Sequence, residues 1–220
     1  MKNVAGYDVS RLMAGSMGTL GVILDVSLKV LPMPMLEATL RIAANQAHAL
    51  ELMNQWGAEP LPISATCWIA GVLSVRLSGA PPAVRAAQLR LGGTHVDEAE
   101  AQSLWVSLRD GQHEFFAGNG TLWRLSTPSV TPPLAWTRDC LIEWGGAQRW
   151  FHTAADPTEI HALAASVGAG ATSFKSETQR AQVFAPFAPL APPVLALHQR
   201  IKAQFDPHRL FGRGRLHPEL

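Results

Sequence analysis

The start of the chain combines a helical turn, a glycine-rich loop and an alternating apolar stretch. Residues 9–13 fit one helical turn, which Asp8 or Ser10 can cap. Apolar residues then occupy every second position from Val22 to Val30, a period typical of a strand with one buried face. The pattern therefore predicts a helical turn, a glycine loop and a strand, in this order.

From residue 35 onward, stretches with a period of two alternate with stretches of helical period. Strands are predicted at residues 37–44, 63–70, 72–77, 121–126, 140–144, 148–153 and 170–174. Helices are predicted at residues 46–56, 82–91, 97–108 and 157–167. Gly71 and the pair Gly145–Gly146 predict two hairpins. The strand-helix-strand order occurs twice, which predicts a ferredoxin-like α+β layer.

The last predicted element is an amphipathic helix near the C-terminus. Its apolar stripe consists of Val194, Leu197, Ile201 and Phe205. The Asp206–Pro207 pair ends the helix, because the residue before a proline avoids the helical region. Three arginines follow in the tail, Arg209, Arg213 and Arg215. We expect this tail to be solvated.

Four glycines lie within sixteen residues near the start of the chain: Gly6, Gly15, Gly18 and Gly21. Glycine permits positive φ and the close approach of a ligand, so this loop is a candidate cradle for a phosphate or a nucleotide. A dinucleotide-binding fingerprint requires a strand before the glycines and a helix after them. The order here is reversed, which argues against that motif. A glycine-rich corner without any ligand is the alternative interpretation.

Composition narrows the classes of function. A net charge of +1 gives no electrostatic case for binding nucleic acid or an anionic membrane surface. There is no apolar run of transmembrane length and no signal-peptide pattern at the start, so we expect a cytoplasmic protein. Cys67 and Cys140 are far apart and form no CxxC motif. Buried thiols are therefore expected rather than a metal or redox site.

Several motifs resemble one family of flavoproteins. The stretches 2–8 (KNVAGYD) and 15–22 (GSMGTLGV) are similar to the end of the FAD-binding domain of vanillyl-alcohol-oxidase type enzymes. The stretches 61–64, 120–124, 142–150 and 205–216 are similar to the FAD-binding subunits of bacterial glycolate oxidases. The resemblance extends over nearly the whole chain.

The resemblance implies an α+β fold in three parts. Residues 1–34 would be the C-terminal part of the FAD-binding domain, and residues 35–183 an antiparallel cap, or substrate, domain. Residues 184–220 would be a C-terminal helix and tail that pack back on the FAD domain. Family members begin well upstream, so we expect this chain to lack the N-terminal part of that domain. A split FAD domain leaves a strand unpaired, which predicts poor solubility without partners.

The resemblance also implies FAD as the cofactor. The residues that would contact it are Gly6, Tyr7, Asp8, Gly15, Ser16, Gly18, Gly21 and Val22. Tyr7 has a second interpretation, as a core side chain whose hydroxyl is satisfied by a backbone carbonyl. Near the C-terminus the family usually shows Asn-Pro-Gly-Arg, of which only Gly214 and Arg215 match.

The sequence identifies no catalytic residue and no metal site. Flavin-oxidising relatives carry a His-x-Gly-Asp-Gly-Asn-type cluster that does not occur here. The eight histidines form no HExxH motif and no i, i+4 pair. Asp110, Glu114 and Glu143 would serve as a base only if the fold brought one of them to a flavin.

The leading hypothesis is an FAD-binding subunit of a glycolate-oxidising complex. It would support oxidation of glycolate to glyoxylate and would not be active alone. Its partners would be a second flavin subunit and an iron–sulfur subunit, with at most peripheral membrane association. Two alternatives remain open: a non-catalytic docking subunit with an incomplete flavin site, and a flavin dehydrogenase for another small 2-hydroxy acid.

Overall fold

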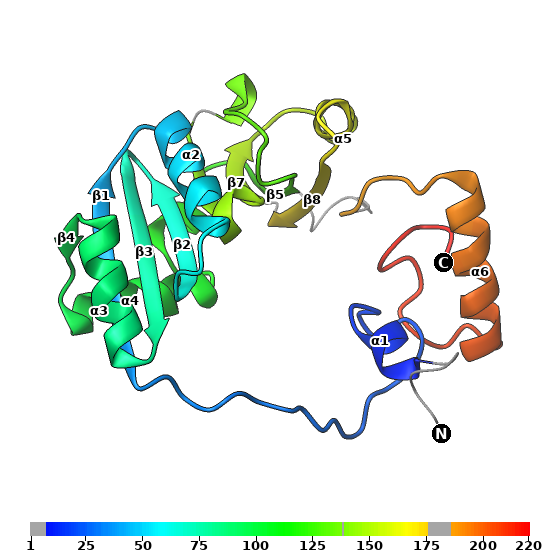
Figure 1. Cartoon of the computed structure of the whole chain (residues 1–220). Helices are drawn as coiled ribbons and strands as arrows, with labels where there is room; N and C mark the ends of the chain where they lie inside the picture. Colours follow the sequence, from blue (N-terminus) through cyan, green and yellow to red (C-terminus); the bar gives the residue numbers. More distant parts are fainter. Residues whose placement is uncertain (1–7, 138, 176–185) are drawn as a thin grey trace. The chain divides into compact units, whose positions relative to one another are not determined.

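The computed structural model describes residues 8–137, 139–175 and 186–220 (Figure 1). The chain divides into two compact units. Unit 1 consists of Met1–Val30 and Gln179–Leu220, and unit 2 consists of Leu31–Thr178.

Unit 2 contains an eight-stranded antiparallel sheet with the strand order β4-β1-β3-β2-β6-β7-β5-β8. The strands are β1 (Leu36–Ala43), β2 (Ile63–Ile69), β3 (Val72–Gly79), β4 (Thr94–His95), β5 (Thr121–Ser126), β6 (Cys140–Glu143), β7 (Gln148–Thr153) and β8 (Gly170–Lys175). The helices of this unit are α2 (Gln46–Gly57), α3 (Pro81–Leu91), α4 (Glu98–Arg109) and α5 (Pro157–Ser166). Three 3₁₀ turns lie between them: η1 (Glu114–Ala117), η2 (Ala135–Thr137) and η3 (Trp144–Gly146). Helices and an antiparallel sheet confirm the predicted α+β class.

The sheet has two halves that mirror each other in strand order. The first half, β4-β1-β3-β2, has the chain order strand, helix, strand, strand, helix, strand. The second half, β6-β7-β5-β8, repeats the order in reverse but has a proline-rich loop and η2 between β5 and β6. The halves join through the pairs Cys67↔Glu143 and Trp68↔Ile142 of β2 and β6.

One face of the sheet, which we call the α2 face, holds the main apolar core. Trp68 lies on this face and donates from its indole nitrogen to the Ala44 carbonyl oxygen, 2.8 Å away. α2 contributes Gln46, whose amide donates to Cys140 Sγ, and α5 contributes His161, which packs edge-on against Trp123. The largest apolar side chains of this face are almost fully buried: Leu73, Val75, Leu77, Trp123, Ile142 and Phe151.

The opposite face, which we call the α4 face, is partly covered. Registers that pair Thr39 with Arg76, Cys67 with Glu143 and Arg124 with Trp150 place these side chains on the same side of the sheet. α4 and η1 pack on this side in a cluster around Cys67, Leu108, Phe116, Leu122, Leu141 and Trp150. The strand end beyond this cluster carries Phe174, which is 54% exposed.

Arg149 is a charged residue at the centre of the α2 face. Its side chain is 0% exposed. The guanidinium donates to the carbonyl oxygens of Thr131, Pro132 (2.8 Å) and Gly146 (3.4 Å). Burial lowers the pKa of this group. Three main-chain oxygens replace its hydration, so Arg149 fixes the proline-rich loop against η3.

The predicted helical turn before the glycine loop is confirmed in unit 1. α1 runs from Val9 to Met13, and Asp8 caps it by accepting from the Arg11 amide at 3.0 Å. The C-terminal helix is also confirmed, as α6 (Pro192–Phe205), with Asp206 as its C-cap.

The predicted strand at residues 22–30 is wrong. These residues have no strand partner among the described parts of the chain, and Leu24 and Leu28 are 93% and 77% exposed. Period-two alternation shows only which side chains would share a face if the segment were extended. A strand also needs a neighbouring strand to accept and donate its backbone hydrogen bonds. The apolar stretch is therefore exposed.

The turn at η3 provides a test of this packing. Gly146 has φ +98°, and a Cβ there would lie 2.8 Å from the Ser129 carbonyl oxygen and 2.9 Å from Leu50 Cδ2. We expect Gly146→Ala to destabilise unit 2 by about 2 kcal/mol or more, because both the backbone conformation and the packing oppose a methyl group. Urea unfolding followed by tryptophan fluorescence measures the change.

Gly57→Ala is the matched control. A Cβ at Gly57 meets nothing within 4 Å, so this variant should unfold within about 0.5 kcal/mol of the wild type. Equal stability of the two variants would show that η3 is not constrained as described.

Candidate functional site

Asp8 of the predicted cofactor site has a structural task in unit 1. Besides capping α1, its carboxylate pairs with Arg11 at 3.2 Å. Gly6 and Tyr7 lie outside the described residues. Asp8 therefore fixes the start of α1, which leads into the glycine loop.

The glycine loop is built from two tight turns. Ser16 donates its amide to the Met13 carbonyl oxygen at 3.1 Å, and the Ser16 carbonyl oxygen accepts from the Thr19 amide at 3.0 Å and the Thr19 hydroxyl at 2.7 Å. Gly15 and Gly18 have φ values of +78° and +74°, and a Cβ at either would meet nothing within 4 Å. Both glycines thus satisfy a backbone requirement and leave open space beside the loop.

The loop has main-chain donors that find no acceptor in the described part of the chain. Among those residues, the amides of Gly15, Met17 and Gly18 make no backbone hydrogen bond. Unpaired amides beside open space suit an anionic or strongly polar ligand group. The loop can therefore accommodate a cofactor that approaches its main-chain amides, as the resemblance to flavoproteins implies.

Gly21 and Val22, the remaining predicted contacts, lie after the loop. Gly21 is half-buried, and Val22 is 68% exposed. They begin the exposed apolar stretch described above. The structure thus brings Asp8, Gly15, Ser16 and Gly18 into one corner of unit 1 and leaves Val22 on the surface.

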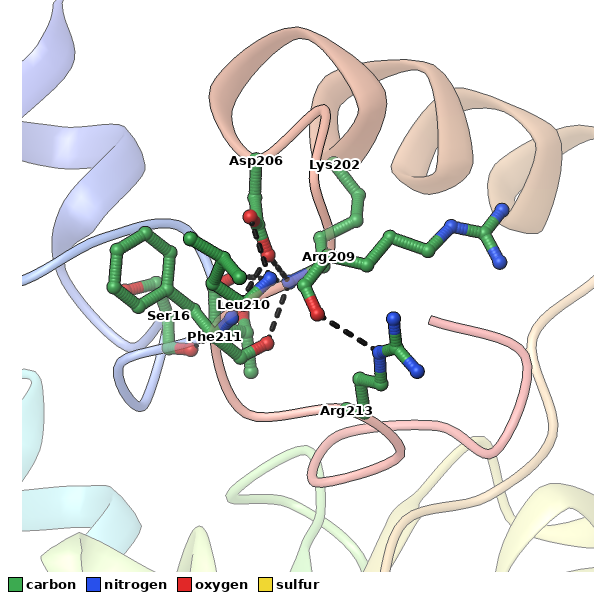
Figure 2. Close-up of polar contacts among 8 residues, drawn as sticks. Ser16, Lys202, Asp206, Arg209, Leu210, Phe211 and Arg213 are labelled. Carbon is green, nitrogen blue, oxygen red and sulfur yellow. Dashed lines mark hydrogen bonds and ion pairs between the residues drawn. The ribbon is translucent and has the colours of Figure 1, made fainter.

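A buried cation ties the glycine loop to α6 (Figure 2). Lys202 Nζ lies 2.6 Å from each of three oxygens: the Thr19 carbonyl, the Phe211 carbonyl and Asp206 Oδ2. Lys202 and Asp206 are 6% and 2% exposed. We call these four residues the Lys202 cluster. Its ammonium uses all three of its N–H donors internally and has none left for a phosphate.

Asp206 holds the turn after α6. Its two carboxylate oxygens accept from the amides of Leu210 at 2.8 Å and Phe211 at 2.9 Å. Burial alone would raise the pKa of Asp206, but the hydrogen bonds from Lys202, Phe211 and Leu210 outweigh it and lower the pKa to about 2. The carboxylate is therefore ionised wherever the unit is folded at ordinary pH.

The Lys202 cluster was not predicted from the sequence. Lys202 and Asp206 stand at i and i+4, the spacing at which opposite charges meet on a helix. That spacing was the available signal. It gave no indication of the Thr19 contact, which joins residues 183 positions apart.

The tail returns to the glycine loop. Arg215 donates to the Met17 carbonyl oxygen at 3.2 Å, and a Cβ at Gly212 would lie 3.1 Å from Thr19 Cγ2. Arg209 and Arg213 are exposed, and Arg213 donates to the Arg209 carbonyl oxygen at 2.8 Å. All three arginines face solvent as expected for a solvated tail, while Arg215 also contacts the loop.

Unit 2 carries a second group of polar and aromatic side chains, on its α4 face. Glu143 Oε2 accepts from the Trp150 indole at 2.8 Å and from the Gln148 amide at 3.2 Å. Trp150 packs edge-on against Phe174, whose ring also lies beside the Arg124 guanidinium. Asp110, another carboxylate considered as a base, pairs with Arg109 at 2.8 Å. Glu143 thus lies among aromatic side chains, whereas Asp110 is held in a surface ion pair.

The hairpin turn η3 presents an exposed tryptophan. Trp144 has φ +53° and is 74% exposed. It lines an open hollow of about 400 Å³ together with Met53, Asn54, Gly57, Ala58, Ser129 and Gly145. The hollow has no titratable side chain, so it offers contacts but no acid or base.

The cysteines and histidines form no metal centre among the described residues. Cys67 and Cys140 are buried free thiols, which confirms the expectation for both. Burial raises the pKa of both thiols, that of Cys140 to about 11. Neither is therefore a reactive thiolate at neutral pH.

The Lys202 cluster generates a prediction for the glycine loop. We expect Lys202→Met to speed amide exchange at residues 206–211 and 16–19 by about tenfold or more, because the variant leaves the buried Asp206 carboxylate unpaired. Hydrogen exchange with mass spectrometry measures this. Lys29→Met removes the same charge from an exposed position and should leave both segments unchanged.

The same cluster predicts an acid transition. The pKa of Asp206 is lowered in the folded state, so its stabilising contribution is complete above the ordinary pKa of 3.8 and is lost as pH falls toward about 2. Protection of residues 206–211, measured relative to the intrinsic exchange rate at each pH, should therefore fall over this window. In Asp206→Asn the segment should exchange fast already at neutral pH and show no such step. A transition that persists in the variant would assign it to another group.

Comparison with known proteins finds one similar protein, a subunit of an oxidase. No protein-family model matches the sequence. Among residues 8–137, 139–175 and 186–220, no helix has the length and apolar character that a bilayer span requires. Over all 220 residues the chain is 42% identical to glycolate oxidase subunit GlcE of Escherichia coli (strain K12) and spans 60% of that protein's length. This match confirms the resemblance seen in the motifs, and the chain is a relative of a glycolate oxidase subunit.

Proposed function

We propose that the chain acts as part of an FAD-linked subunit of a glycolate-oxidising complex. The match to a glycolate oxidase subunit over every residue of the chain carries this proposal. The open amides of the glycine loop support it from the structure. The complex would convert glycolate to glyoxylate, and this chain would not do so alone.

We propose that the two units are parts of such a subunit. In this proposal, residues 1–34 and 184–220 belong to a vanillyl-alcohol-oxidase type FAD domain, and residues 35–183 form its cap. The division into two compact units supports this assignment. The strand and helix order of the first half of the sheet supports a ferredoxin-like cap.

The residues proposed to hold FAD are those of the glycine segment. Gly15 and Gly18 would let the cofactor approach the free amides, and Ser16 and Asp8 would hold the loop in shape. Gly6, Tyr7, Gly21 and Val22 complete the proposed set. FAD, when bound, would supply a group that takes up and passes on electrons, while the companion flavin subunit would oxidise the hydroxy acid.

The proposed partners are a second flavin subunit and an iron–sulfur subunit, in the cytoplasm and with at most peripheral membrane contact. The exposed apolar side chains from Val22 to Met35 support a need for partners. Poor solubility of the isolated chain remains a prediction. A non-catalytic docking role and another 2-hydroxy acid as substrate are the competing outcomes.

Flavin retention tests the proposal. The purified chain is incubated with FAD, desalted and examined for visible flavin absorption. We expect the wild type to retain flavin and Gly15→Ala to bind it about tenfold more weakly, because the new Cβ occupies the space through which the cofactor approaches.

Gly111→Ala is the matched control. Gly111 also has a positive φ, +65°, and open space around a Cβ, but it lies in unit 2. Backbone strain is thus similar in both variants, and only Gly15→Ala should lose flavin. A wild-type chain that retains no flavin would contradict a flavin site within these residues and favour the docking role.

A further inference from the structure

The segment that follows the glycine loop, residues 22–30, has no strand partner among the described residues (Figure 1). All of its side chains are exposed, and Leu24, Leu28 and Val30 are 93%, 77% and 79% exposed. A contiguous apolar surface that is open to solvent marks a site of interaction with another molecule. The question is therefore which molecule this segment suits.

The segment has the character of a strand that lacks a neighbour. Its alternation would place two kinds of side chain on opposite sides of an extended backbone. One side would carry Val22, Leu24, Val26, Leu28 and Val30, and the other would carry Ile23, Asp25, Ser27 and Lys29. Pro32 ends the stretch, because proline cannot donate to a strand ladder. A second strand would satisfy the amides and carbonyls that a lone strand leaves unpaired.

The two charges of the segment indicate what that second strand is. Asp25 and Lys29 lie at equal distances before and after Ser27. If two copies of the segment pair as antiparallel strands about a two-fold axis at Ser27, Asp25 of each copy lies opposite Lys29 of the other. Directly opposite side chains have Cβ atoms about 4.5–5.5 Å apart, and opposite charges at such positions stabilise the pair. The segment is thus complementary in charge to itself.

Other registers lose this complementarity. An axis at Val26 would place Lys29 opposite Ile23 and Asp25 opposite Ser27, so neither charge would meet its counterpart. Parallel strands in register would place Asp25 beside Asp25 and Lys29 beside Lys29, which is repulsive. A slip of one residue would bring the apolar side of one strand onto the polar side of the other. The antiparallel register about Ser27 is therefore favoured.

The same axis also matches the apolar side. It places Val26 opposite Leu28 and Leu24 opposite Val30, so aliphatic side chains meet aliphatic side chains along the pair. Neighbouring strands lie about 4.8 Å apart, whereas each copy carries folded chain both before and after the segment. A third copy would clash with these folded parts, which limits the association to two copies.

We propose that two copies of this chain associate through residues 24–30, paired as antiparallel strands about a two-fold axis at Ser27. The partner is a second copy of the chain, and the interface is isologous because both copies use the same residues. This inference does not rest on the proposed function. It requires no flavin, so its failure and the failure of the flavin test are separate results.

Sedimentation velocity of the full chain over about a hundredfold range of concentration tests the proposal. We expect a monomer–dimer equilibrium for the wild type. Asp25→Lys or Lys29→Asp places like charges opposite each other and should raise the dissociation constant of the dimer about tenfold or more. The double variant Asp25→Lys/Lys29→Asp restores opposite charges and should dimerise like the wild type. Arg200→Asp, which reverses an exposed charge on α6, is the matched control and should also dimerise like the wild type.

A disulfide test reports the register directly. Ser27→Cys places a thiol of each copy at the two-fold axis, so mild oxidation should produce a covalent dimer. Ile23→Cys is the matched control, because its two thiols would lie about 25 Å apart in this register and should not join. The native Cys67 and Cys140 are buried and do not compete.

A wild type that stays monomeric over the whole range would overturn the proposal and leave the segment to a different partner. Open-ended aggregates in place of a dimer would overturn it too. So would a double charge variant that dimerises no better than the single ones, or cross-linking of Ile23→Cys as fast as that of Ser27→Cys.

Discussion

The pairing of β2 with β6 determines how the sheet in unit 2 presents its side chains. Two residue pairs, Cys67↔Glu143 and Trp68↔Ile142, join the two halves of the sheet. Alternate residues point to opposite faces, so a slip of one residue would move every side chain of one half to the other face. The observed register buries Trp68 and Ile142 under the helices of the α2 face. It consequently places Glu143, and Arg124 beyond it, on the partly covered α4 face.

Unit 1 depends on a different interaction, the buried Lys202 ammonium. Its three oxygen partners come from the glycine loop, the helix end and the tail. Because these contacts satisfy the cation internally, the loop has its shape without a ligand, and any anionic group must be met by main-chain amides. Lys202 therefore fixes the conformation of the glycine loop, whereas Gly15 and Gly18 leave space beside it.

Local patterns predicted most elements and few long-range contacts. Periodicity identified α2 and the β2–β3 hairpin to within two residues, because an element that packs on one side repeats its apolar positions at its own period. It failed at residues 22–30, where the alternation is clear but no strand in the described residues pairs with it. Lys202 and Arg149 were not recognised, since all the acceptors of Arg149 and two of the three acceptors of Lys202 are main-chain oxygens that no side-chain pattern reveals. The strand order could not be predicted from local patterns either. The flavin contacts remain predictions that rest on the resemblance.

The glycine segment of unit 1, which the tail contacts through Arg215, is proposed to hold FAD. Hydrogen exchange of the full chain, with and without FAD, tests it most directly. The account predicts slower exchange at residues 14–22 and 211–216 when FAD is present, and unchanged exchange in β1, β2 and β3. Protection confined to the sheet, or no protection anywhere, would contradict it.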